Sequence, residues 1–193
     1  MGAPSQVDTL PNNQSPQFEN NTNNDGPPPV SKAELEATYT SLIQQYLQVM
    51  CLENATFLAE RMVASCKTTN ALYLLAVCHY RNHAPQRALC VLEDVKEPDA
   101  ASLYLLAKCC FDLEHYGRAE EALLQQARVE YKNYKALSPT MSVSTMDEWL
   151  METSPCPIPN GAAGFYLLGN ICRKSNRKQR ASVYYKMSLQ VRP

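Results

Sequence analysis

Cysteine and histidine are the residues of this chain that could most readily bind a metal or act as nucleophiles. No two cysteines are spaced as Cys-x-x-Cys, a common spacing for zinc ligands and redox pairs. Six cysteines lie in apolar stretches of helical character, where a thiol packs as a small hydrophobic side chain. We therefore favour buried thiols in a reducing compartment over a disulfide framework or a zinc site. The eight cysteines are Cys51, Cys66, Cys78, Cys90, Cys109, Cys110, Cys156 and Cys172.

Two groups of these residues are close enough in sequence to suggest a catalytic or metal site. Cys109 and Cys110 are adjacent, so a helix directs them to different faces, and His115 follows in a predicted turn. His79 and His83 are one helical turn apart, but His83 lies at a predicted helix end. No glycine-rich phosphate loop, Ser–His–Asp set or carboxylate pair is evident. We predict no enzyme, hence no catalytic residue, cofactor or metal, with the histidine pair as the weaker alternative.

Charge and hydropathy argue against several classes of partner. The chain has 18 Lys and Arg against 19 Asp and Glu, so no overall charge attracts nucleic acid or a membrane surface. No apolar run approaches the ~20 residues of a membrane span, and the N-terminus does not resemble a signal peptide. We predict no nucleic acid, no membrane and no small-molecule substrate. A basic cluster near the C-terminus (Arg173, Lys174, Arg177, Lys178, Arg180, Lys186 and Arg192) is interpreted as a solvated helix turn, with an import signal or a contact to an acidic partner as alternatives.

The elements that carry these residues are indicated by small side chains at a fixed interval. Ala76 precedes Ala88 by twelve residues, and Ala107 and Gly169 precede Ala119 and Ala181 by the same interval. A small residue on each of two consecutive helices lets their backbones approach closely. The pattern therefore predicts a stack of helical hairpins.

The chain divides into a polar leader and a helical array. Residues 1–30 contain six prolines, many asparagines and no Lys or Arg, so we expect a disordered leader. The array is expected over residues 31–193, where Ser31 and Glu34 form a capping box at its start. The predicted hairpins cover about 31–49 with 54–66, 70–82 with 85–95, 100–113 with 116–129, and 162–175 with 178–191.

The interval before the last hairpin is longer than one repeat. We interpret residues 130–161 as an irregular insertion because they are rich in Pro, Ser and Thr, and a degenerate repeat is the alternative. Within the insertion, Thr145 and Glu148 form a second capping box that predicts a short helix. Trp149 is expected to dock this helix onto the array, or alternatively to anchor a partner.

The set of motifs resembles the tetratricopeptide repeat. Large residues follow the hairpin alanines by four positions, as Leu92, Leu123 and Tyr185, and Pro193 closes the last repeat in the same way. The resemblance covers about residues 33–127 and 162–193. It implies an all-α fold, a right-handed superhelix of about four helical hairpins.

Three segments resemble one family more closely, the cell division cycle protein 27 homologues, which are subunit 3 of the anaphase-promoting complex, or cyclosome. These segments are NATFLAERMVAS, ALYLLAVCHYR and SLYLLAKCCFDLEHYGRAEEAL. The resemblance implies a non-catalytic scaffold subunit of a multi-subunit ubiquitin ligase in mitotic cell-cycle control. It also implies a homodimer formed by the N-terminal repeats, contacts with other subunits of the complex, and a location in nucleus and cytoplasm.

Two features depart from that family. A polar leader precedes the first helix, and the chain stops at Pro193 just after a hairpin, so we expect a piece of a longer protein. The family's C-terminal repeat array, which captures Ile-Arg tails, has no counterpart in this sequence. That activity is therefore not carried over.

The resemblance also indicates a partner-binding face. In a tetratricopeptide repeat, the position of Tyr73, Tyr104 and Tyr166 faces the concave groove, and Lys108 and Asn170 lie one turn further on. Tyrosine offers ring area and a hydroxyl at low entropic cost, so we predict that these residues bind a partner. The alternative is that the rings only fill space between repeats.

A second copy of the first helix is the expected occupant of this groove. Tyr39, Leu42, Ile43 and Tyr46 recur at helical spacing and are predicted to be its contact residues. The alternative is that this stripe forms the core of its own hairpin. A free-standing adaptor that binds a short peptide in the groove is the alternative function.

Overall fold

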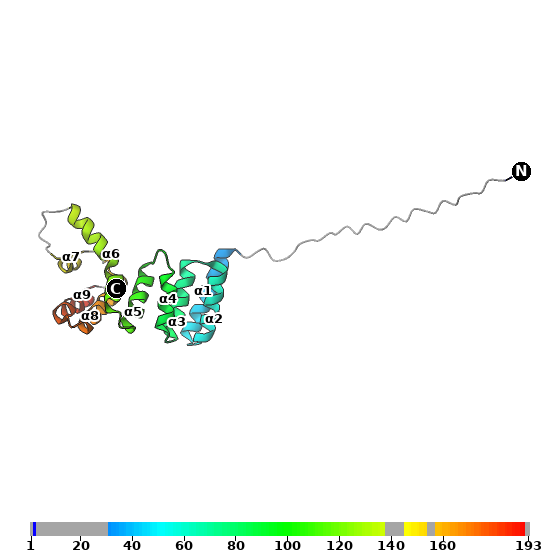
Figure 1. The fold of residues 1–193 in the computed structure, drawn as a ribbon, viewed down its shortest axis with the longest axis horizontal. Helices are drawn as coiled ribbons and strands as arrows, with labels where there is room; N and C mark the ends of the chain where they lie inside the picture. Colours follow the sequence, from blue (N-terminus) through cyan, green and yellow to red (C-terminus); the bar gives the residue numbers. More distant parts are fainter. Residues whose placement is uncertain (1, 3–30, 138–144, 154–156, 192–193) are drawn as a thin grey trace. The chain divides into compact units, whose positions relative to one another are not determined.

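The computed structural model describes Gly2 and residues 31–137, 145–153 and 157–191. All regular secondary structure in these residues is helical (Figure 1). Residues 1 and 3–30, which make up nearly all of the predicted leader, lie outside the described residues, as does Pro193. The described part holds nine helices and no strand, so the all-α prediction is confirmed. The helices are α1 (Lys32–Gln48), α2 (Leu52–Cys66), α3 (Thr69–Arg81), α4 (Pro85–Glu93), α5 (Ala100–Asp112), α6 (Tyr116–Leu137), α7 (Met146–Glu152), α8 (Ala162–Lys174) and α9 (Lys178–Gln190).

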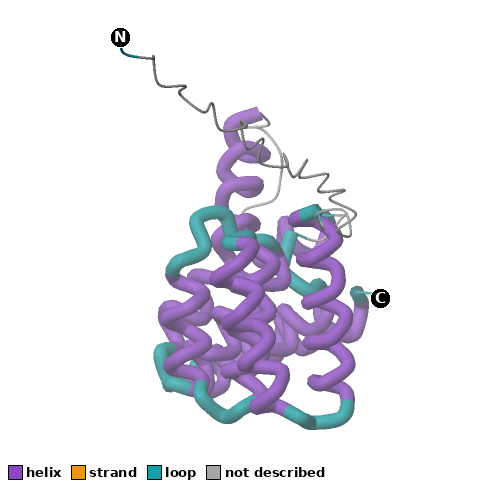
Figure 2. Tube along the Cα trace, turned by 90° about the vertical axis from the view of Figure 1, so that its right-hand side faces the viewer, coloured by secondary structure: helices purple, strands orange, loops and turns teal. Residues whose placement is uncertain are grey.

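The helices pack as four consecutive hairpins. Helix α1 packs on α2, α3 on α4, α5 on α6, and α8 on α9. Figure 2 shows the helices standing side by side, with the connecting loops at the upper and lower ends of the helices. The first helices of the hairpins also contact one another, α1 with α3, α3 with α5, and α5 with α8. They therefore form one continuous layer of a repeat solenoid.

Side-chain caps define where several helices begin. Ser31 accepts from the Glu34 amide while the Glu34 carboxylate accepts from the Ser31 amide, which is the predicted capping box. Thr145 and Glu148 form the same box at α7. Asp99 caps α5 by accepting a hydrogen bond from the amide of Ser102. Each cap satisfies an amide that has no partner within its helix.

Every hairpin turn has the same backbone geometry. Met50, His83, Glu114 and Asn176 all have positive φ, between 56° and 61°. Each lies seven residues after the small-residue position of its first helix, which is Ile43 in the first hairpin. The amide of the following residue donates a hydrogen bond to the carbonyl five residues before it, as from Ala84 to His79 at 3.0 Å. This closure ends a helix with a left-handed residue. The four turns thus confirm the repeat register, including the first hairpin, where Ile43 stands in place of a small residue.

The small residues that set the twelve-residue interval lie in the interface of each hairpin. Ala76, Ala88, Ala107 and Ala119 are 0% exposed, and Ala181 is 3% exposed. In the first hairpin Ile43 takes the small-residue position and is also 0% exposed, opposite Ala55. Close approach of the paired backbones is therefore the basis of the pattern, as predicted.

Helix α6 is longer than the sequence predicted. We expected it to end near Val129 and an irregular insertion to start at about residue 130, whereas the helix continues to Leu137. Its last turns are held by Trp149 of α7, whose ring centroid lies 5.6 Å from that of Tyr131 and 6.1 Å from that of Tyr134. Because Trp149 is only 6% exposed, this contact docks α7 onto the array, as predicted.

Ion pairs join α6, α7 and α9 and correct the interpretation of the basic cluster. Arg177 binds Glu120 through two hydrogen bonds of 3.0 and 2.7 Å, and Arg180 binds Asp147 through two of 3.0 and 3.1 Å. The buried Tyr184 hydroxyl donates to the same Asp147 at 2.9 Å. Both arginines are therefore structural, whereas Arg173, Lys174, Lys178 and Lys186 are exposed.

Candidate partner-binding face

The layer of first helices carries the predicted tyrosine row, Tyr73 on α3, Tyr104 on α5 and Tyr166 on α8. These residues occupy equivalent positions of three hairpins whose first helices contact one another in sequence. Tyr73 and Tyr104 are partly exposed, and Tyr166 is 58% exposed. Burial raises the pKa of the Tyr73 and Tyr104 hydroxyls, and the charge of Asp99 adds to the effect at Tyr73. These hydroxyls remain protonated and can donate a hydrogen bond to a partner.

Lys108 is engaged within the array. Its Nζ lies 4.9 Å from the centroid of the Tyr80 ring, an arrangement that favours a cation–π interaction. The Tyr80 hydroxyl donates to Asp112 at 2.7 Å, and burial together with this bond raises its pKa. The pair ties α3 to α5 on the same face as the tyrosine row. Tyr80 was missed from the sequence, although it follows Tyr73 by seven residues, or two helical turns.

Asn170 is engaged within the last hairpin. Its side-chain oxygen accepts a hydrogen bond of 2.9 Å from the Tyr185 hydroxyl. The Tyr185 ring lies 5.7 Å from the ring of Tyr166, which remains open to solvent. The structure therefore brings Tyr166, Asn170 and Tyr185 together, and Tyr166 presents the open surface of this group.

The predicted contact residues of α1 divide between core and surface. Ile43 is 0% exposed and packs with Leu47 in the core of the first hairpins, so for Ile43 the core alternative holds and the contact prediction is wrong. Tyr39 and Tyr46 pack against the same core but remain partly exposed, and Leu42 is 39% exposed. Val49, the cap residue directly after α1, continues this line and is 66% exposed. We call Tyr39, Leu42, Tyr46 and Val49 the α1 stripe; their spacing of three and four residues places them on one helix face.

Hydrogen bonds fix α1 against α3 and so hold the α1 stripe in place. The carboxylate of Glu36 accepts from Thr68 at 2.9 Å and from Asn70 at 3.1 Å. At the other end of α1, Arg81 donates to the carbonyl of Leu47 at 3.1 Å. A cation at the carboxyl end of a helix also interacts favourably with the helix dipole.

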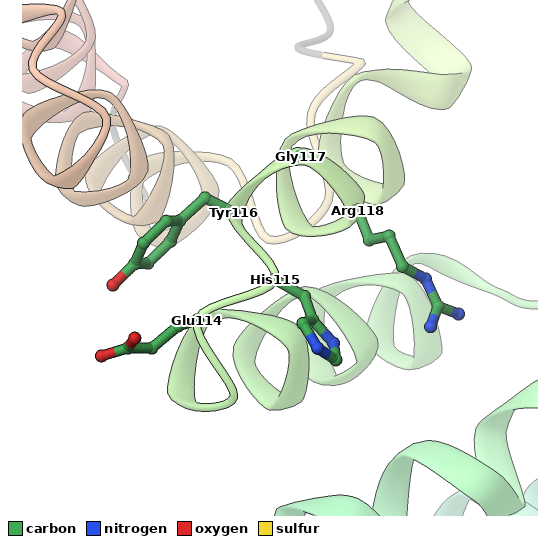
Figure 3. Close-up of a pocket in the computed structure, with 5 residues that line it drawn as sticks. All are labelled: Glu114, His115, Tyr116, Gly117 and Arg118. Carbon is green, nitrogen blue, oxygen red and sulfur yellow. The ribbon is translucent and has the colours of Figure 1, made fainter.

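A pocket at the α5–α6 turn is lined by Glu114, His115, Tyr116, Gly117 and Arg118. Its acidic and basic side chains do not face one another as a catalytic pair would. Figure 3 shows Glu114 and Tyr116 pointing to one side of the turn and His115 and Arg118 to the other. Arg118 also pairs with Glu93 at 2.6 Å. Within the described residues, no three His, Cys, Asp or Glu side chains are placed to hold a metal ion. None of the described helices is long and apolar enough to cross a membrane.

Burial controls the reactivity of the described cysteines. Cys51 and Cys90 are exposed, whereas the remaining described thiols (Cys66, Cys78, Cys109, Cys110 and Cys172) are buried. Burial raises the pKa of Cys78 to about 11 and that of Cys109 to about 12, so their thiolates are scarce at neutral pH.

We predict that iodoacetamide at pH 8 modifies Cys51 and Cys90 of the native chain, because the other described thiols are buried. Mass spectrometry of the digested protein measures this, and unfolding in urea should make the buried thiols reactive. Alkylation of native Cys109 as fast as that of Cys90 would contradict the burial.

The repeats are similar in sequence to proteins of one known family. Residues 50–126 match the family model described as anaphase-promoting complex, cyclosome, subunit 3. Cell division cycle protein 27 homolog A of Arabidopsis thaliana is 31% identical over 82% of this chain and 18% of its own length. The Homo sapiens cell division cycle protein 27 homolog is 28% identical over 82% of this chain and 17% of its own length. The chain therefore spans about a fifth of the length of these relatives.

A solved structure supports the fold. The crystal structure of MamA superposes with a TM-score of 0.55 and 16% sequence identity, covering 80% of this chain and 77% of the other. At this identity the likeness concerns the fold alone.

Proposed function

We propose that this chain is a tetratricopeptide region of the type found in cell division cycle protein 27, subunit 3 of the anaphase-promoting complex, and that it is a non-catalytic scaffold of that complex. The match over residues 50–126 and the relatives aligned over 82% of the chain support this proposal. In this role the repeats hold a second copy and neighbouring subunits in a fixed arrangement. The complex would place the chain in the nucleus and cytoplasm.

Self-association through the first hairpin is the central part of the proposal, and the α1 stripe is the observation that carries it. The stripe lies on the first described hairpin of the stack, so no preceding hairpin among the described residues covers it. Leu42 of α1 is 39% exposed, and Val49, the cap residue directly after α1, is 66% exposed. Ordered apolar side chains in a row on an exposed helix face are typical of a protein–protein contact.

The tyrosine row is the proposed receiving surface for α1 of the second copy. A helix satisfies its own backbone hydrogen bonds, so it can lie against a layer of helices through side chains alone. Leu42 and Tyr46 would supply the anchors, with Val49 beside them, and the hydroxyls of Tyr73 and Tyr104 would donate to polar side chains. The two copies would exchange equivalent contacts, as in a two-fold homodimer.

Charge on the α1 stripe should separate the copies. With Leu42→Asp and Tyr46→Asp together, we expect two differently tagged copies no longer to co-purify, whereas unmodified copies do. Each lost anchor at an interface centre costs on the order of 2 kcal/mol, or roughly 30-fold in Kd. Co-purification of co-expressed tagged chains, with circular dichroism to verify folding, measures the effect.

The matched control is Phe57→Asp on α2, because Phe57 is 57% exposed but lies outside the stripe. This variant should co-purify like the unmodified chain. The proposal is wrong if the α1 variant still co-purifies, or if Phe57→Asp has the same effect.

The alternative is a free-standing adaptor that binds a short peptide, and the exposure of Tyr166, at 58%, favours it. An adaptor would be monomeric and would lose peptide binding when Tyr166 is replaced by Ala. The scaffold would keep its self-association when only Tyr166 is changed, since the α1 stripe remains.

A further inference from the structure

A groove with an apolar floor runs along α6, separate from the tyrosine row. Its floor is formed by Leu92 of α4, Val95 of the following loop, and Leu103 and Leu106 of α5. Leu92 is 2% exposed, and Val95 and Leu103 are each 8% exposed, so the floor is firmly packed. One wall is α6, which lines the groove from Arg118 to Lys132.

The unexpected extension of α6 beyond Val129 adds Lys132 to the far end of this groove. At a rise of 1.5 Å per residue, the stretch from Arg118 to Lys132 spans roughly 21 Å. The end of α6 projects beyond the neighbouring helices (Figure 1). Tyr131 and Tyr134 hold α7 on one side of the projecting segment, while Val129 and Lys132 line the groove on another. Val129 is 56% exposed, an apolar side chain open to solvent in a formed groove.

The groove and the tyrosine row use different faces of α5. Successive residues of a helix are about 100° apart around its axis, so Leu106 points roughly opposite to Tyr104 and to Lys108. An occupant of the groove would therefore leave the tyrosine row free. The two surfaces can be tested independently.

The two ends of the groove differ in charge. At its near end Arg118 is paired with Glu93 at 2.6 Å, and Glu121 lies beside them. At its far end Arg128 and Lys132 are one turn apart, and neither has a hydrogen-bond or ion-pair partner within the described residues. A ligand that brings carboxylates to the far end would complement these two cations.

The helical surroundings of the groove also indicate the secondary structure of its occupant. The α6 wall and the α5 part of the floor are helical, and their interior amides and carbonyls are already paired, so an extended strand would find few backbone partners there. A helix brings its own backbone hydrogen bonds and needs only an apolar face. A length of about 21 Å corresponds to roughly four turns of helix.

We propose that this α6 groove binds an amphipathic helix of another protein. The apolar stripe of that helix lies on Leu92 and Leu103 of the floor and against Val129. Glutamate or aspartate side chains in its first turn, where the helix dipole favours anions, pair with Arg128 and Lys132. This surface gives the array a second class of partner and does not depend on self-association through α1.

Fluorescence anisotropy with a designed peptide tests the proposal on the full 193-residue chain. The probe is a labelled helical peptide of about four turns, with leucines at i, i+3, i+4 and i+7 and two glutamates in its first turn. We expect saturable binding that weakens at least tenfold with Val129→Asp and with Arg128→Glu plus Lys132→Glu. Changing both peptide glutamates to glutamine should remove the sensitivity to the second variant.

Two control variants separate the groove from other surfaces. Leu189→Asp changes an apolar residue of α9 that is 87% exposed, and Tyr104→Ala removes a ring of the tyrosine row; both should bind the peptide like the unmodified chain. The proposal is overturned if the peptide does not bind, if Val129→Asp binds as well as Leu189→Asp, or if a composition-matched scrambled peptide binds equally. If Val129→Asp instead converts a dimer to a monomer, the groove binds a second copy and the proposed partner is wrong.

Discussion

Replacing Trp149 with alanine should lower the free energy of unfolding by about 3–5 kcal/mol, the usual cost of truncating a buried tryptophan. Trp149 is 6% exposed and packs against Tyr131 and Tyr134 of α6. Helix α7 has seven residues, too few to be stable without packing. Its release would also remove Asp147 from Arg180 and Tyr184, which are bound to it in the intact array.

Urea unfolding followed by circular dichroism measures this loss, and hydrogen exchange locates it. The amides of residues 130–137 should lose protection, because Trp149 holds the last turns of α6. Met151→Ala is the matched control on the same helix; Met151 is 54% exposed, so its replacement should change stability by less than about 0.5 kcal/mol. Equal costs for the two substitutions would show that α7 is not docked through Trp149.

Gly169→Ala should destabilise the last hairpin by about 1–3 kcal/mol through overpacking, partly offset by the better helix propensity of alanine. A Cβ at this position would lie 2.5 Å from Cε1 of Tyr185. That ring is held by its hydrogen bond to Asn170 and by its contact with Tyr166, so it cannot turn away freely. Thermal and urea unfolding measure the change.

A second substitution, at Tyr185, should rescue this loss of stability, and another hairpin of the array shows which residue to use. The positions of Gly169 and Tyr185 are occupied by Ala76 and Leu92 in the second hairpin. With Tyr185→Leu in place, Gly169→Ala should become neutral or stabilising by up to about 1 kcal/mol. If Gly169→Ala costs the same in the presence and in the absence of Tyr185→Leu, the glycine is not needed for the tyrosine ring.

The sequence was most informative where the determining interactions are local and repeated. The spacing of Ala76 and Ala88 predicted a hairpin because close backbone approach requires small side chains at that interval. The capping boxes at Ser31 and Thr145 were predictable for the same reason, since each depends on residues three apart. The positive φ of His83 and Glu114 was not foreseen, because neither residue is a glycine.

Features set by distant partners escaped prediction. Helix α6 runs past Val129 because Trp149, which lies on another helix, covers Tyr131. Arg177 belongs to an ion pair with Glu120, 57 residues earlier, which no local pattern reveals. For the candidate partner face, spacing placed Tyr73, Tyr104 and Tyr166 on the first helices of their hairpins but could not show that Ile43 points into the core.

The mass of the unmodified chain in solution tests the central claim most directly. Size-exclusion chromatography with multi-angle light scattering at micromolar concentration should give twice the 21.7 kDa chain mass, because the α1 stripe is expected to pair two copies. The same measurement on the Leu42→Asp, Tyr46→Asp chain should give a single chain mass. A monomeric mass for the unmodified chain at that concentration would contradict the self-associating scaffold.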